Sequence, residues 1–373
     1  MFAMKQGWEI KKLGDVCNLY QPRTISGEML VEDGKYLVYG ANGIIGRYNE
    51  YNHERSEVLL TCRGATCGTI NVSEPYSWIN GNAMVVQPKN DNIGKIYLQY
   101  LLQAVDWGKV ITGAAQPQIT RQSLSPLDVI IPPKEEQERI VKELDCLSGG
   151  IEKKKQQLKE LDALAQSIFY QMFGDPISNE KGWEVKKLGE VCNKITDGTH
   201  NSPKSFPSGV YMDVTAKNIK KDGFDLSNIT YVPEDVHKSI YSRCNPVLGD
   251  ILYIKDGATT GIAMINSLKE EFSLLSSVAL LKCNYDMVSN IFIKEVLNST
   301  SKYNEIRGNM GGAAITRLTI NKIENIYIPL PPITLQQEFA EKIEAIEKQK
   351  EIIKQSIKET ETLFNSRMNY YFN

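Results

Sequence analysis

The sequence lacks the long apolar segments of a membrane or secreted protein. Its first thirty residues hold no apolar run of signal-peptide length, and no later stretch approaches the roughly 18 uninterrupted apolar residues of a membrane span. We therefore expect a cytoplasmic protein that does not contact a membrane. With 373 residues, the chain is long enough for two domains with separate cores.

Cysteine is sparse and irregularly placed. Seven cysteines, an odd number, disfavour a disulfide framework and favour reduced, mostly buried thiols. The closest pair, Cys62 and Cys67, has a gap in the range of zinc ligands, but no second pair and no nearby histidine completes a site. We expect no metal in this chain.

The chain also lacks an excess of basic charge. Its 43 basic and 45 acidic side chains give a net charge of -2, whereas a protein that coats DNA is usually strongly basic. Any binding to DNA must therefore rely on locally arranged charge, or on partners that supply more of the phosphate contacts.

Catalytic motifs are missing as well. There is no Walker A motif, and the Asn/Asp-Pro-Pro-aromatic motif of adenine methyltransferases is absent because the two double prolines are followed by Lys134 and Ile333. A nuclease of the Pro-Asp…Glu-x-Lys type needs a Pro-Asp dipeptide, which does not occur, although residues 9–11 and 184–186 match the tail of that motif. We therefore name no catalytic residue.

What the chain does contain is an internal repeat. The sequence GWEIKKLGDVC from Gly7 recurs as GWEVKKLGEVC from Gly182. Two shorter matches lie further along: residues 63–68 (RGATCG) with 256–261 (DGATTG), and the Ile-Thr-Arg triplets 119–121 and 315–317. An aliphatic segment ending in a double proline closes each copy. The chain is thus two copies of one unit.

Each copy ends in a segment whose apolar residues step alternately by four and three, which is typical of a coiled-coil helix. We expect helices at 134–174 and 333–373, with globular domains at 1–133 and 175–332. Gly149 and Gly150 predict a kink or a break in the first helix. The expected seam residues are Ile140, Leu144, Leu147, Ile151, Leu158, Leu161, Ile168, Phe339, Ile343, Ile346, Ile353, Ile357 and Phe364.

Connectivity constrains how these helices pair. Only a short link separates the end of the first helix at Phe173 from the second Gly-Trp motif at Gly182, so the second domain begins at the far end of that helix. Pairing the helices within one chain then requires that they run antiparallel, which gives an approximate two-fold axis. A coiled coil with another chain is the alternative, because periodicity does not specify the partner.

The domain interiors favour an α+β fold with many short strands. We expect two similar strand-rich domains separated by a long antiparallel coiled coil of two helices, with internal pseudo-two-fold symmetry. Helical stretches near 93–107 and 288–303 follow the strands of each domain. The expected strands are 36–39, 58–61 and 83–86 in the first copy, and 250–254 and 278–281 in the second.

The Gly-Trp-Glu-x-x-x-Leu-Gly opening, the Gly-Ala-Thr-x-x-Gly-like loop, the double proline followed by Glu136-Gln137 or Gln336-Gln337, and the whole arrangement written twice resemble type I restriction-modification specificity subunits. The resemblance spans essentially the whole chain. It implies two target-recognition domains that read a bipartite, asymmetric target in double-stranded DNA, and a coiled coil that sets the spacing between its two parts.

The resemblance also implies partners. The coil would dock two DNA-adenine methyltransferase subunits, and restriction subunits would join them. S-adenosylmethionine, ATP and Mg would then be bound by those partners, and this chain would hold no cofactor. Residues 196–200 (TDGTH) resemble a loop common in these recognition domains, whereas the first copy has Gln21-Pro22-Arg23 instead, so we expect the two domains to read different sequences.

Reading base edges requires donors and acceptors on rigid turns: arginine suits guanine and phosphates, and glutamine or asparagine suits adenine. For each candidate the alternative is a loop residue that stabilises its own turn. Glycines 64, 68, 257 and 261 are expected to serve backbone conformation. The candidates for DNA contact are Arg63, Thr66, Gln116, Gln118 and Arg121 in the first domain, and Thr199, His200, Asn201, Lys255, Thr259, Thr260 and Arg317 in the second.

Three hypotheses about function follow. The chain is a recognition subunit of a larger enzyme, a self-contained DNA enzyme with unrecognised motifs, or a coiled-coil scaffold that binds no nucleic acid. The missing catalytic motifs favour the first over the second, and sequence-specific DNA binding separates the first from the third.

Overall fold

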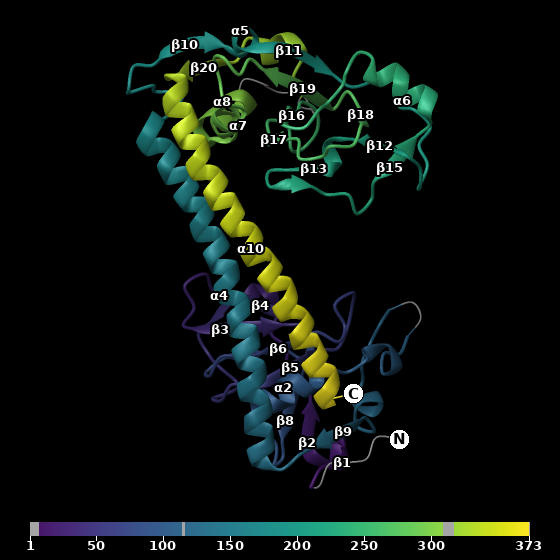
Figure 1. Cartoon of the computed structure of the whole chain (residues 1–373). Helices are drawn as coiled ribbons and strands as arrows, with labels where there is room; N and C mark the ends of the chain where they lie inside the picture. The colour runs from purple at the N-terminus through teal and green to yellow at the C-terminus, as the bar shows by residue number, and fades with distance from the viewer. Residues whose placement is uncertain (1–6, 114–115, 309–316, 373) are drawn as a thin grey trace. The chain divides into compact units, whose positions relative to one another are not determined.

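The computed structural model describes residues 7–113, 116–308 and 317–372. It divides into two compact units: unit 1 is Met1–Lys155 with Lys354–Asn373, and unit 2 is Gln156–Ile353. Each unit therefore holds one copy of the repeat together with part of each long helix (Figure 1). Within the described ranges, no helix is long and apolar enough to cross a membrane.

Over residues 7–113 and 116–133, the globular part of unit 1 contains three small sheets. Strands β2-β8-β5-β6 form an antiparallel four-stranded sheet, β4-β3-β7 form a second sheet in which β3 and β7 are parallel, and β1 pairs with β9. The elements are β1 (Glu9–Lys12), α1 (Leu13–Val16), β2 (Cys17–Tyr20), β3 (Tyr36–Gly40), β4 (Gly43–Tyr48), β5 (Val58–Thr61), β6 (Ile70–Val72), β7 (Trp78–Ile79), β8 (Ala83–Pro88), α2 (Lys95–Gln103), α3 (Arg121–Leu124) and β9 (Asp128–Ile131).

Unit 2 repeats this plan. Its sheets β11-β19-β16-β17, β15-β12-β18 and β10-β20 match those of unit 1 in order, and the β13-β14 hairpin is added. The elements are β10 (Glu184–Lys187), α5 (Leu188–Val191), β11 (Cys192–Asp197), β12 (Tyr211–Val214), β13 (Ile219–Lys220), β14 (Gly223–Phe224), β15 (Thr230–Val232), α6 (Glu234–Tyr241), β16 (Ile251–Ile254), β17 (Ala263–Ile265), β18 (Phe272–Leu274), β19 (Val278–Cys283), α7 (Asn290–Asn298), α8 (Thr300–Gly308), α9 (Ile320–Glu324) and β20 (Tyr327–Leu330). The predicted α+β class with two similar domains is confirmed.

The central strand of each four-stranded sheet is buried on both faces. In β5, Val58 and Leu60 join the cluster that contains Leu98 of α2, whereas Leu59 packs on the other face with Tyr39 of β3. The strand of unit 2 divides in the same way, with Ile251 and Tyr253 on one face and Leu252 and Ile254 on the other. Successive side chains of a strand point to opposite faces, and both faces of these strands are buried. This explains why the residues of β5 and β16 are apolar, except for Thr61 at the end of β5.

The third repeat match is wrong by three residues. Ile119 donates its backbone N–H to Cys62 O, and the residue that makes the same bond to Lys255 O is Leu318. Thr120 and Thr319 follow and are the N-caps of α3 and α9. The structure therefore aligns Thr120 with Thr319, at equal distances from the two double prolines. Ile315 and Thr316 of the predicted triplet lie outside the described residues.

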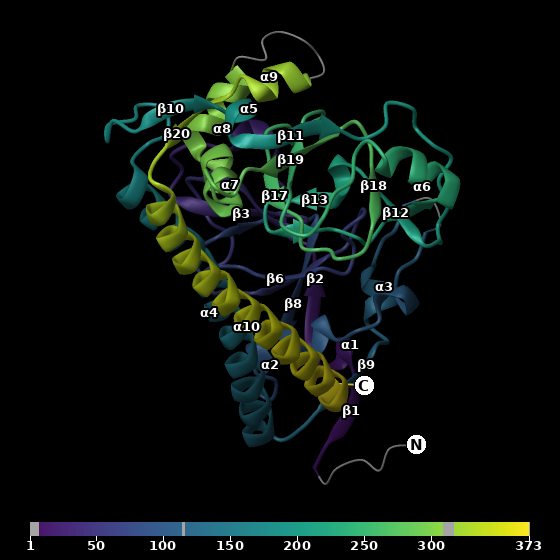
Figure 2. The same ribbon diagram turned by 45° about the horizontal axis from the view of Figure 1, so that its top comes forward.

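The two long helices, α4 (Lys134–Phe173) and α10 (Ile333–Phe372), each contribute to both units. In unit 1, Lys154 Nζ donates to Thr360 Oγ1 at 2.8 Å, and Tyr371 OH donates to Glu143 Oε2 at 2.6 Å. Residue numbers thus rise along one helix as they fall along the other. The segments lie side by side in both views and run antiparallel (Figures 1 and 2).

In unit 2 the pairing has the same sense. Lys350 forms an ion pair with Asp162 at 2.7 Å, and the ring of Phe339 lies 5.8 Å from that of Phe169. The helices therefore pair within this chain, as predicted. Every expected seam residue, from Ile140 to Phe364, is buried or half-buried.

We predicted a kink or a break at Gly149 and Gly150; the break is wrong, because α4 continues through both residues. A Cβ added at either position would meet nothing within 4 Å. We expect Gly149→Ala and Gly150→Ala each to raise the free energy of unfolding by about 1 kcal/mol, since alanine loses less backbone entropy in a helix. Urea unfolding measures this. Gly68→Ala is the opposite control and should destabilise the protein. Gly68 has a φ of +96°, and a Cβ added there would lie 2.7 Å from the Trp107 ring. Loss of stability in the helix variants would contradict the account.

Candidate functional site

A glycine-rich turn follows the central strand of each domain. In unit 1, residues 63–68 fold back so that Cys67 N donates to Gly64 O and Gly68 N donates to Thr61 O. Gly64 and Gly68 have φ values of +84° and +96°, a region that disfavours side chains. Residues 256–261 form the same turn in unit 2, with φ of +104° at Gly257 and +101° at Gly261. As predicted, these glycines serve backbone conformation.

A second segment, far away in the sequence, pairs with each turn. Arg63 forms a bridge with Gln118, and Gly64 N donates to Pro117 O at 3.2 Å. In unit 2, Asp256 forms the matching bridge with Arg317. The fold thereby brings together candidates that lie more than fifty residues apart.

The candidates of unit 1 are all solvent-accessible. Arg63, Thr66, Gln116 and Gln118 are exposed on the turn and on the paired segment, and Arg121 is the exposed first residue of α3. Their guanidinium, hydroxyl and amide groups include both donors and acceptors. That these groups contact bases stays a prediction.

The candidates of unit 2 divide into two groups. Lys255 is 2% exposed and Thr260 is fully buried, where its hydroxyl donates to Gly257 O. These two side chains therefore support the turn from inside and present nothing to a ligand in this conformation. Thr259 and Arg317 are exposed, although Arg317 Nε lies 3.2 Å from Asp256 Oδ1.

The remaining candidates, Thr199, His200 and Asn201, form a loop directly after β11. Thr199 N donates to Leu274 O, and Thr199 Oγ1 accepts from Asn201 N. Thr199 is half-buried, while His200 and Asn201 are exposed. This loop joins the turn of unit 2 through a residue that the sequence analysis did not select.

That residue is Asp197, at the end of β11. It is 5% exposed, and its carboxylate forms ion pairs with Lys255 Nζ at 3.3 Å and Arg243 Nη1 at 3.2 Å and lies 3.2 Å from His200 Nε2. A buried carboxylate requires such partners. The signal that could have marked Asp197 is its place at the end of a half-apolar strand, within the TDGTH segment of residues 196–200.

A matched pair of glutamines was also missed as structural residues. Gln137 is buried; its Oε1 accepts from Gly94 N, and its Nε2 donates to Asn92 O and Pro132 O. Gln336 makes the same three bonds in unit 2, to Ser289 N, Met287 O and Pro331 O. Each glutamine fixes the start of a long helix to the start of the helix that covers the sheet.

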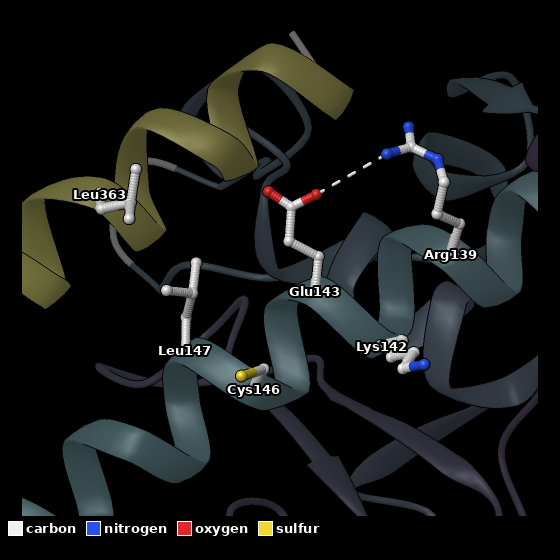
Figure 3. Close-up of a pocket in the computed structure, with 6 residues that line it drawn as sticks. All are labelled: Arg139, Lys142, Glu143, Cys146, Leu147 and Leu363. Atoms are coloured by element: carbon white, nitrogen blue, oxygen red, sulfur yellow. Dashed lines mark ion pairs between the residues drawn. The ribbon is translucent and has the colours of Figure 1, made fainter.

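The helix pair of unit 1 carries a shallow groove of about 510 Å³. Figure 3 shows its lining, in which Arg139 and Glu143 form an ion pair at 3.8 Å. Leu363 is 49% exposed on α10, and Cys146 is exposed on α4. The groove combines apolar and charged side chains, which include also Lys142 and Leu147.

Asp213, on β12, gives unit 2 a pH dependence. Within the described part of the chain its Oδ1 has no hydrogen-bond partner, and burial raises the pKa of this carboxyl to about 6. As pH rises from the unfolded pKa of 3.8 to about 6, the unfolded chain ionises first, so stability falls across this window and stays lower above it.

We expect Asp213→Asn to raise the free energy of unfolding at pH 8 by about 1–3 kcal/mol and to change little at pH 3, where both states are protonated. Denaturant unfolding of this variant at the two pH values, beside exposed Asp222→Asn, tests this. An equal effect at both pH values would show that the carboxyl does not carry the pH dependence.

This chain is similar in sequence to one protein family and to several known proteins. The family described as Type I restriction modification DNA specificity domain matches residues 5–163 and again 180–362. The type I restriction enzyme MjaIX specificity subunit of Methanocaldococcus jannaschii is 26% identical over 311 residues, which cover 76% of this chain and 69% of the relative. The MjaVIII specificity subunit of the same organism is 21% identical and covers 98% and 92%.

Two solved structures have a similar fold. The crystal structure of a type I restriction-modification S subunit from M. genitalium has a TM-score of 0.63 at 14% identity, with 98% of this chain and 97% of that chain covered. A chain from a structure concerning complex assembly and conformational transition of the type I R-M system has a TM-score of 0.59 at 17% identity, with 100% and 99% covered.

Proposed function

The chain belongs to the type I restriction modification DNA specificity family, and we infer from this membership that it is the non-catalytic specificity subunit of a type I restriction-modification complex. The observation that carries the inference is the double match, one family domain for each copy of the repeat. One chain with two similar domains can read a bipartite target, as a two-fold dimer reads two half-sites.

In each domain, the glycine turn and the segment bridged to it form the surface that we assign to base reading. The turn is held by its own backbone bonds, so exposed side chains on it are presented from a rigid support. The side chains differ between the domains: the exposed Arg63 and Gln118 of unit 1 correspond to the half-buried Asp256 and the exposed Arg317 of unit 2. Different donors and acceptors predict different half-sites, hence an asymmetric target.

We further propose that the helix pair docks two DNA-adenine methyltransferase subunits, which restriction subunits join in the cytoplasm. The groove around Leu363 and Glu143 is our candidate for one such contact, because an exposed leucine beside charged groups suits an interface with an apolar centre and polar rim. S-adenosylmethionine, ATP and Mg would act on those partners, and this chain would select where they act.

Arg63 provides the direct test of base reading by unit 1. In the assembled methylating complex, we expect Arg63→Ala to reduce the preference for one half-site by about 5- to 150-fold, the loss of about 1–3 kcal/mol typical of a bidentate base contact. The other half-site and the spacing should stay unchanged. Base-resolution mapping of adenine methylation gives the preference at each position.

Lys358→Ala, which removes an exposed positive charge on α10 of the same unit, is the matched control. It should leave both half-sites unchanged. If Arg63→Ala weakened methylation uniformly at all sequences, Arg63 would be a phosphate contact instead.

A further inference from the structure

The two domains differ at one pair of side chains next to their candidate surfaces, which is buried in unit 2 and partly exposed in unit 1. In unit 1, β8 pairs with β2 on one side and with β5 on the other. In unit 2, β19 pairs in the same way with β11 and β16. The aligned triplets are Leu19–Val86–Val58 and Ile195–Leu281–Ile251. Two residues beyond the first member lie Gln21 and Asp197, and four beyond the third lie Cys62 and Lys255. The pairs Gln21–Cys62 and Asp197–Lys255 therefore occupy equivalent positions.

The pair of unit 1 is neutral, and only Cys62 of it is buried, because Gln21 is exposed. Gln21 Nε2 lies 3.1 Å from Cys62 Sγ and donates to Gly81 O at 2.9 Å, and Cys62 Sγ donates to Asn82 O at 3.1 Å. Burial raises the pKa of the Cys62 thiol, so the sulfur stays protonated. This pair ties the residues after β2 to the turn before β8.

The pair of unit 2 is ionic and reaches further. Besides Lys255, the Asp197 carboxylate binds Arg243 and the exposed His200, and Arg243 Nη2 donates to Gly198 O at 2.6 Å. Lys255 Nζ also lies 3.5 Å from Asp256 Oδ2, inside the glycine turn. The buried pair thus connects the loop 198–201 to the turn 256–261.

The loop itself is closely packed. A Cβ on Gly198 would lie 1.9 Å from Leu274 O, and Ser276 N donates to Thr199 O. His200 is consequently held from both sides, by the backbone before it and by Asp197 at Nε2. When the neutral ring donates from Nε2 to this carboxylate, Nδ1 is an acceptor, which suits the amino group of adenine or cytosine in the major groove.

Folding alone does not require the ionic form of this pair. Well-packed neutral groups commonly replace a buried ion pair without loss of stability, whereas removal of one partner is strongly destabilising. Unit 1 has a neutral, partly buried pair at the equivalent position of the same sheet. A role beyond folding would explain the charges in unit 2.

We propose that Asp197 and Lys255 are positioning residues that set the loop Gly198–Asn201 for base reading, and that this pair is one reason why the two domains read different half-sites. The inference rests on the proposed function. It assigns to two buried residues a part in DNA specificity that needs no contact between them and DNA.

The experiment separates stability from specificity. Asp197→Asn and Lys255→Met are each expected to lower the melting temperature of the full chain, because each leaves a buried charge with fewer partners. The double variant should regain much of that loss, since it restores a neutral pair. In the methylating complex, however, the double variant should lose at least tenfold in preference at the half-site that Arg63→Ala does not affect, while the spacing is unchanged.

Two further variants complete the set. Asp250→Asn with Lys282→Met removes another ion pair of the same sheet, in which Lys282 Nζ lies 2.6 Å from Asp250 Oδ2, and should leave the motif unchanged. Lys255→Arg keeps the cation and should keep the preference. An unchanged motif in the Asp197/Lys255 double variant would overturn this inference alone, whereas a wild-type chain that directs no bipartite methylation would overturn the proposed function together with it.

Discussion

Truncation of Phe339 to alanine is expected to lower the free energy of unfolding of unit 2 by about 3–5 kcal/mol, the range typical of a buried phenylalanine. Phe339 is fully buried at the start of α10. Its ring lies 5.1 Å from that of Phe173 at the end of α4, which in turn lies 4.8 Å from Phe292 of α7. The truncation therefore leaves a cavity where two long helices and the sheet-covering helix meet.

Urea unfolding, with hydrogen exchange read in β16 and β19, measures this effect. Ile352→Ala is the control on the same helix, because Ile352 is 64% exposed and its truncation should change stability by less than about 0.5 kcal/mol. If Phe339→Ala cost no more than this control, the three rings would not form a core that joins the helices to unit 2.

Replacement of Gln137 by leucine is expected to destabilise unit 1 by about 2–4 kcal/mol. Leucine fills a similar volume but leaves Gly94 N–H and the carbonyls of Asn92 and Pro132 without their partner, and each unsatisfied buried group costs about 1–3 kcal/mol when no water replaces the bond. Gln336→Leu should have the same effect in unit 2, because it makes the same three bonds.

Chemical unfolding of both variants, compared with Gln349→Leu at an exposed position of α10, tests the matched role. Equal losses from Gln137→Leu and Gln336→Leu would support an anchor repeated in the two units. A loss confined to one unit would mean that the two glutamines are equivalent in geometry and different in energy.

Much of the fold was predictable because the sequence contains an internal repeat. The repeated opening motif and the apolar steps of four and three along α4 and α10 are local patterns, and local patterns are what a sequence displays. The Ile-Thr-Arg triplets were misaligned by three residues because they were matched by their identical residues. Their distances from the double prolines were not used. Counting back from the double prolines aligns Thr120 with Thr319, as the structure does.

The candidate surface was only partly predictable. The glycine turns stood out because the Gly-Ala-Thr sequence recurs in both copies, and the turns led to Arg63 and Thr259. Lys255 looked equally suitable in the sequence. No local pattern indicates that this lysine, which follows an apolar strand, is buried against Asp197. Residues that act through long-range contacts, such as Gln137, become visible only when the chain is folded.

The central claim is that this chain chooses where a partner enzyme methylates DNA. The direct measurement is a base-resolution map of adenine methylation in cells that carry the gene for this chain with its neighbouring methyltransferase gene, compared with cells that lack only this gene. We expect a bipartite, asymmetric motif with a constant gap that disappears with the gene. Methylation that persists unchanged without this chain would contradict the account.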